Sequence, residues 1–154
     1  MFTFGGVVLN TEDITDEEAL VFPNGGANCM NWLVGHIIDA RNQLLAFLQQ
    51  QPVWHNKEFA CYARGANPSQ SLELFLPFSR LIEHFKSSCE RVAEGIKNTP
   101  SDQLNNVFTI SSNDGIINSH TLLEWFTVFS FHESYHTGQT GFLRRVLGKE
   151  GKIK

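Results

Sequence analysis

Residues 119–147 read SHTLLEWFTVFSFHESYHTGQTGFLRRVL, and this stretch decides the fold. Large side chains recur in it at spacings of three and four residues, which is typical of one buried face of an α-helix. Thr121 followed by Glu124 matches a capping box, and Gly148 is a common helix stop. The sequence therefore predicts a long helix over residues 119–147, capped by Ser119 or Thr121. Its buried stripe comprises Leu122, Trp125, Phe129, His132, His136, Gln139, Leu143 and Val146.

Three polar side chains interrupt this stripe where a buried face would carry apolar ones. His132, His136 and Gln139 follow one another along it, between Phe129 and Leu143. Buried polar groups are costly unless they find partners. Residues four apart lie on the same helix face, so the two imidazoles point the same way, and imidazole is a common metal ligand. We therefore expect His132 and His136 to bind one divalent metal ion. Gln139 is placed to hydrogen-bond a ligand or a water on the metal.

Other segments predict the remaining elements. Residues 29–50 and 71–96 show the same spacing of three and four, and each is followed by a proline within a few residues. Residues 15–20 begin with a capping box, which predicts a short helix. Residues 2–9 are apolar and predict a short helix or a strand.

These elements predict an all-α domain over residues 1–154, folded as an up-and-down four-helix bundle with long crossover loops. The loops are residues 51–70 and residues 101–118, the second of which is polar and contains a turn signal at Asn113-Asp114-Gly115. Loops of this length in a compact domain often carry function. We expect residues 51–70 to cover a substrate.

His36 is the best candidate for a third metal ligand. It lies on the apolar stripe of its helix between Leu33 and Ala40. In an antiparallel bundle, the start of that helix can face the middle of the last one, where His132 and His136 lie. Three histidines that leave coordination positions open are typical of catalytic metal sites. The alternative is that all three are core histidines with hydrogen bonds inside the protein.

His132-Glu133-Ser134-Tyr135-His136 also fits the zinc-protease pattern H-E-x-x-H. However, Phe142 stands where the extended pattern needs a third histidine, and Glu133 points about 100° away from His132 around a helix. We therefore do not favour a protease. Glu133 and Gln139 are the catalytic candidates that the sequence offers.

Composition excludes several classes of protein. The formal net charge of the 154 residues is −4, and the lysines and arginines form no cluster, so we expect no nucleic-acid partner. The three cysteines are an odd number without a C-x-x-C pair, which fits a reducing compartment. No signal peptide and no membrane span is evident. We expect a cytoplasmic protein.

Three motifs carry a family resemblance: NWLVGHI at 31–37, HESYHTGQ at 132–139 and LRRVLG at 143–148. In this order and at this separation they resemble the DinB-like (YfiT-type) metalloenzyme superfamily, over residues from about 12 to 150. The resemblance implies a four-helix bundle that is often dimeric. It also implies a metal site at the motif histidines His36, His132 and His136, with zinc or nickel as the usual metal. The family usually has a longer first helix than the one expected here.

The resemblance further implies enzymes that transfer low-molecular-weight thiols. Our leading hypothesis is a metal-dependent thiol S-transferase, in which the metal activates a thiol cosubstrate or a water and a small molecule is the substrate. Trp32, Tyr62 and Arg64 are the expected substrate contacts, with Arg64 facing an anionic group. The alternatives are a metal-dependent hydrolase and a non-enzymatic metal-binding or stress-response dimer. In each case we expect a homodimer.

Overall fold

The computed structural model describes residues 2–23, 26–55, 59–70, 72–111 and 115–153. Its helices are α1 (Phe2–Thr11), α2 (Asp16–Ala19), α3 (Met30–Phe47), α4 (Phe78–Asn98) and α5 (Leu122–Val146). Its two strands are β1 (Val107–Ser111) and β2 (Ile117–Thr121), and short 3₁₀ turns lie at Ala60–Tyr62, Pro68–Gln70, Leu72–Leu74 and Ser101–Asn105. No helix in these described ranges is long and apolar enough to cross a membrane.

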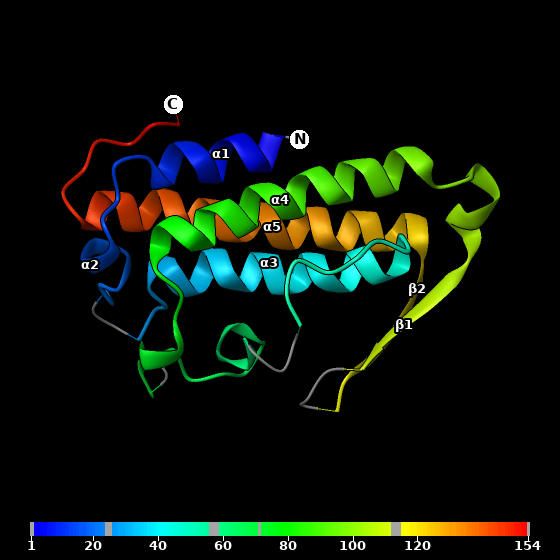
Figure 1. The fold of residues 1–154 in the computed structure, drawn as a ribbon, viewed down its shortest axis with the longest axis horizontal. Helices are drawn as coiled ribbons and strands as arrows, with labels where there is room; N and C mark the ends of the chain where they lie inside the picture. The colour runs from blue at the N-terminus through cyan, green and yellow to red at the C-terminus, as the bar shows by residue number, and fades with distance from the viewer. Residues whose placement is uncertain (1, 24–25, 56–58, 71, 112–114, 154) are drawn as a thin grey trace.

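Four main helices pack side by side, as predicted. Figure 1 shows α3, α4 and α5 running alongside one another, with α1 lying along the C-terminal half of α5. Residues 2–9, predicted as helix or strand, are therefore helical and form the fourth member of the bundle. Asn10 fastens α1 to α5, because its amide donates to the Thr137 carbonyl (3.2 Å) and to the Thr140 hydroxyl (3.0 Å).

The core centres on α3, whose side chains are buried over most of its length. α3 packs against both α4 and α5, so it can bury more than one face. α4 instead buries a single stripe that includes Phe78, Leu81 and Phe85. A second apolar cluster of Leu44, Leu48 and Leu122 closes the end of the bundle near the hairpin.

Local sequence signals set several helix ends as predicted. Thr121 caps α5 in a capping box with Glu124, and Thr15 does the same for α2 with Glu18. Gly148 ends α5 in the left-handed conformation at φ +76°, and its N–H donates to the Arg145 carbonyl (3.0 Å).

The predicted start of the second long helix was wrong. The sequence pattern placed it at Ser71, which lies outside the described residues, but α4 begins at Phe78 with Pro77 as its N-cap. A residue before proline is disfavoured in the helical conformation, so Leu76 stays outside the helix. A 3₁₀ turn at Leu72–Leu74 precedes it.

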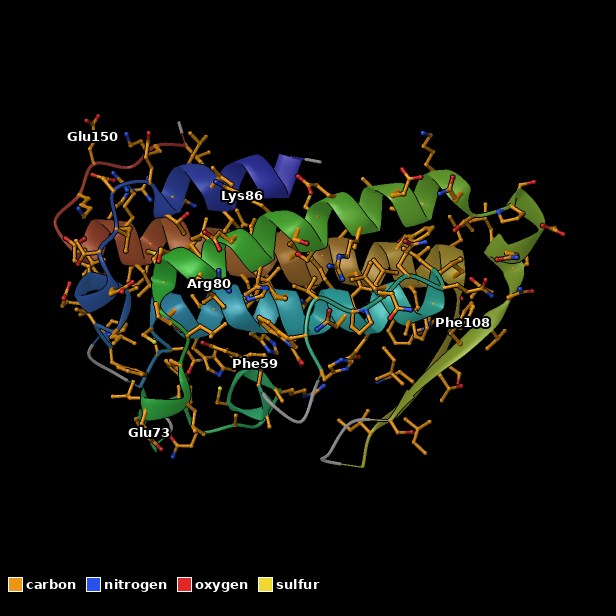
Figure 2. The ribbon with its side chains drawn as sticks, in the orientation of Figure 1. Phe59, Glu73, Arg80, Lys86, Phe108 and Glu150 are labelled. Carbon is orange, nitrogen blue, oxygen red and sulfur yellow. The ribbon has the colours of Figure 1, made fainter. Side chains whose placement is uncertain are left out.

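The predicted polar loop at 101–118 was also wrong. After a 3₁₀ turn, the chain forms an antiparallel hairpin in which Val107 pairs with Thr121 and Ser111 pairs with Ile117. Phe108, labelled in Figure 2, extends from the hairpin. Its ring stacks on Phe47 of α3 with ring centroids 4.6 Å apart. Residues 119–121 therefore belong to β2 and not to the last helix. The turn predicted at residues 113–115 lies partly outside the described residues; Gly115 has φ +80°.

Candidate metal centre

Three histidines from two helices meet inside the bundle. His36 comes from α3, and His132 and His136 come from successive turns of α5. Nε2 of His132 lies 3.1 Å from Nε2 of His36 and 3.2 Å from Nε2 of His136. All three ligand atoms lie within 4.8 Å of one another, so the predicted histidines form a single cluster.

Two of the rings are held by hydrogen bonds at their other nitrogen. Nδ1 of His36 donates to the Tyr62 carbonyl at 2.9 Å, and Nδ1 of His136 donates to Oε1 of Gln139 at 2.6 Å. Trp32 stacks on the His36 ring, with centroids 4.5 Å apart and planes 12° apart. Such outer contacts fix the tautomer and the orientation of metal-binding histidines.

These hydrogen bonds leave the Nε2 lone pairs of His36 and His136 facing the His132 ring. In a neutral ring, a histidine that donates from Nδ1 has a lone pair on Nε2, which is the case for His36 and His136. Both lone pairs face Nε2 of His132, which has at most one hydrogen to donate. At most one of the two N···N contacts can therefore be a hydrogen bond, and a cation bound between the rings would satisfy both.

Burial keeps these rings neutral, as metal ligation requires. It lowers the pKa of His36 to about 4 and the pKa of His132 to about 3, and it also lowers the pKa of His136. Loss of hydration is the largest cause in each case, because an imidazolium is poorly solvated inside the bundle. At neutral pH all three histidines can therefore offer a lone pair.

The two N···N separations from His132 are compatible with a shared divalent cation. Metal–nitrogen bonds of the usual length place ligand nitrogens about 3.0 Å apart around an octahedral ion and about 3.4 Å apart around a tetrahedral one. The separations of 3.1 and 3.2 Å lie between these values. The cluster is thus consistent with a divalent metal ion of either geometry, and it does not select the metal.

A cleft of about 640 Å³ opens beside the cluster. Its walls come from α3, α5, the hairpin and residues 60–64, and both His36 and His132 line it. Its volume is in the range of small-molecule sites. Arg64 lies exposed on this cleft, and its positive charge contributes to lowering the pKa of His36. The contact of Arg64 with an anionic group stays a prediction.

Trp32 and Tyr62, two of the expected substrate contacts, are buried and hydrogen-bonded to other protein groups. The Trp32 indole donates to the Cys61 carbonyl at 2.9 Å. Tyr62 has no exposed surface, and its hydroxyl donates to Asn31 and accepts from the Leu76 N–H. The Tyr62 ring rests on Gly35 so closely that any Cβ at that position would clash. In this arrangement the Trp32 ring and the Tyr62 backbone carbonyl position His36.

Glu133 and Gln139, the two catalytic candidates, are also engaged with protein groups. Both carboxylate oxygens of Glu133 accept from Arg41, at 2.5 and 3.0 Å. Arg41 also donates to Ser88 at 2.8 Å and is only 5% exposed. Gln139 holds the His136 ring, as the expected hydrogen bond to a ligand requires. A catalytic role for either residue is untested by this geometry.

Sequence reasoning missed one acidic residue in the cleft. Asp39 lies on α3 one turn after His36 and lines the same cleft. The sequence contained a signal, since residues three apart share a helix face. Because every residue from Met30 to Asp39 is buried, the apolar stripe of α3 could not single out Asp39.

Comparison with known proteins identifies the family of the chain. No curated protein is significantly similar to the chain. The family model of the DinB superfamily matches residues 9–140, well over half of the chain, and this range contains His36, His132 and His136. The chain belongs to the DinB superfamily.

Proposed function

We propose that this protein is a metal-dependent enzyme of the thiol S-transferase kind, in which His36, His132 and His136 hold one divalent ion, zinc or nickel. One observation carries the proposal: the Nε2 atoms of His36 and His136 both lie within 3.2 Å of Nε2 of His132, beside a cleft that His36 and His132 line. A set of three protein ligands leaves positions free for a substrate, as in catalytic sites.

A bound divalent metal lowers the pKa of a thiol or a water that it coordinates, which provides a nucleophile at neutral pH. In the proposed reaction, the thiol loses its proton and its sulfur replaces a leaving group on an electrophilic carbon of the second substrate. The protein's own contribution is to hold the three imidazoles neutral and oriented through Tyr62, Trp32 and Gln139. Arg64 lines the same cleft, and in this proposal it contacts an anionic group of either substrate.

Elemental analysis of the purified protein tests the metal site. We expect about one metal ion per chain, lost in His36→Ala and in His132→Ala. His55→Ala is the matched control, because His55 is an exposed histidine outside the cluster, and it should keep the metal. A protein that binds no zinc, nickel or manganese after reloading contradicts the proposal and favours a non-enzymatic role.

The chemistry is tested with the metal-loaded protein on two model reactions. An activated aryl halide plus a thiol reports S-transfer, and an activated ester without a thiol reports hydrolysis. We expect thiol transfer that depends on the metal and on His36. Hydrolysis in the absence of thiol transfer would replace the proposal with its hydrolase alternative.

A further inference from the structure

Asp39 is a largely buried carboxylate on the cleft wall that no described protein group pairs with. It exposes 9% of its surface, and no hydrogen bond or ion pair to it occurs within the residues that the structure describes. The two buried arginines, in contrast, each have an acidic partner: Arg41 pairs with Glu133, and Arg144 pairs with Asp13. The oxygens of Asp39 are not among the fully buried atoms that lack a partner, so a group bound in the cleft can reach them. Partial burial weakens their hydration, which favours contact with a cationic group.

The Asp39 carboxylate is not a further ligand of the histidine cluster. The acidic and histidine side chains that come together there are His36, His132 and His136, and Asp39 is not among the group. It lies instead beside the cluster, on the wall of the cleft that His36 and His132 also line. Burial raises the pKa of Asp39 to about 6, so the carboxylate is still mostly charged at neutral pH.

We propose that Asp39 binds the ammonium group of an aminothiol whose sulfur occupies the metal site. The inference rests on the proposed thiol chemistry and narrows its cosubstrate to thiols that carry a free amine. Positions three apart on a helix place their Cβ atoms about 5–6 Å from each other, so Asp39 and His36 can contact neighbouring groups of one small molecule. A cationic amine supplies the missing partner of Asp39, which a neutral or anionic thiol does not.

Thiol binding to the cobalt-loaded protein tests the proposal, because a thiolate on cobalt(II) has a near-ultraviolet charge-transfer band that reports binding without turnover. The probes are 2-aminoethanethiol and its uncharged analogue 2-mercaptoethanol. In Asp39→Asn, we expect the Kd of the aminothiol to rise about tenfold or more, as for a lost charged hydrogen bond. The Kd of 2-mercaptoethanol should stay the same. Asp39→Glu, which keeps the negative charge, should retain part of the preference for the aminothiol over 2-mercaptoethanol.

The ratio of the two Kd values is compared between the unchanged protein and Asp39→Asn. Any direct contact of the amine with cobalt is the same in both proteins, so it does not affect this comparison. Asp102→Asn removes an exposed charge from a 3₁₀ turn outside the cleft and should change neither Kd. If Asp39→Asn weakens the binding of both thiols equally, the ammonium site is overturned. Asp39 would then act as a proton acceptor for the thiol, and the proposed thiol binding would still stand. A protein that holds cobalt but shows no band with either thiol overturns the thiol function and this inference together.

Discussion

The candidate centre depends on which nitrogen each histidine leaves free. Tyr62 and Gln139 each accept a hydrogen from Nδ1, so the Nε2 atoms of His36 and His136 point at the shared site. The two acceptors differ, because one is a backbone carbonyl and the other a side chain. The side-chain acceptor can be removed by mutation without disturbing the backbone, which makes Gln139 the better place to measure this effect.

We predict that Gln139→Leu weakens zinc binding about 10- to 100-fold, the usual effect of losing a hydrogen bond to a ligating histidine. The His136 ring would lose the contact that fixes its tautomer. Competition with a chromogenic chelator measures the affinity. Gln139→Glu, which keeps an acceptor oxygen, should bind zinc at least as tightly as the unchanged protein. Unaltered affinity in Gln139→Leu would show that packing alone orients the ring.

We also predict that Asp39→Asn stabilises the metal-free protein at neutral pH. Burial raises the pKa of Asp39 from the ordinary 3.8 to about 6, so the folded state takes up a proton more readily than the unfolded state. Below pH 4 the carboxyl group is protonated in both states and does not lower the free energy of unfolding. As the pH rises from 4 to 6, the unfolded state ionises first and the folded state loses stability. The difference between the variants should approach about 3 kcal/mol at pH 7 and vanish near pH 3.5. Urea unfolding at several pH values measures it, and a difference that is constant with pH would contradict the burial argument.

Single residues also show how far the sequence could predict this site. His132 and His136 could be found because two polar side chains four apart occupied apolar positions on one stripe. His36 could be paired with them because an antiparallel bundle places its turn opposite theirs. The partner of Glu133 and the burial of Tyr62 could not be predicted, since both depend on contacts between elements far apart in the chain. Glu133 pairs with Arg41, 92 residues away, and the Tyr62 hydroxyl bonds Asn31, 31 residues away.

At the scale of elements, a buried ion pair joins the three long helices. Arg41 of α3 reaches both Glu133 of α5 and, in α4, the Ser88 hydroxyl and the Phe85 carbonyl. Its guanidinium also lies 4.2 Å from the Phe85 ring centroid. Removing one member of such a pair leaves the other charge buried and unpaired, which costs more than the pair contributes.

Glu133→Gln should therefore destabilise the fold by about 3 kcal/mol while the metal content stays at one per chain. Urea unfolding and elemental analysis of the same samples measure the two quantities. The double variant Arg41→Met with Glu133→Leu removes both charges and should regain most of the stability. If Glu133→Gln instead keeps full stability and loses only activity, then Glu133 acts as the catalytic base that the H-E-x-x-H pattern suggests.

The elements that could be predicted are those whose signals are local. Capping boxes at Thr15 and Thr121 and the glycine stop at Gly148 lie within a few residues of the ends they set. The hairpin was missed because its strands are only five residues long and the polar residues around them favour a loop. The alternation of half-buried Phe108 and Ile110 with exposed neighbours was its remaining signal.

At the scale of the whole molecule, the outer face of α5 is apolar although it faces solvent. Val128, Phe131, Tyr135, Phe142 and Val146 recur along it at helical spacing, and Gly138 opens the face at its middle. Phe131 is 73% exposed, and Tyr135 and Phe142 each expose more than half of their surface. Together these five residues present roughly 500 Å² of apolar surface, given the usual size of aromatic side chains.

We propose that this face of α5 pairs with the same face of a second copy in a homodimer. A standard interface buries about 800 Å² per partner, somewhat more than half of it apolar, which is close to what the face offers. One helix crossing its twofold mate near Gly138 brings the aromatic side chains of both copies together, and the glycine permits a close approach. The surface is thus self-complementary, as a twofold interface requires.

The prediction is that Phe131→Arg combined with Phe142→Arg converts a dimer into a folded monomer. Two cations at the centre of an apolar interface would have to be buried without partners, whereas in the monomer they extend into solvent. Sedimentation velocity measures the mass, and circular dichroism together with metal content shows that the bundle is intact. Leu123→Arg is the matched control, because Leu123 is exposed on α5 but lies outside the face, and it should leave the dimer unchanged. A monomer in the unchanged protein at micromolar concentration would contradict the proposal, and a dimer that survives both arginines would place the interface on another surface.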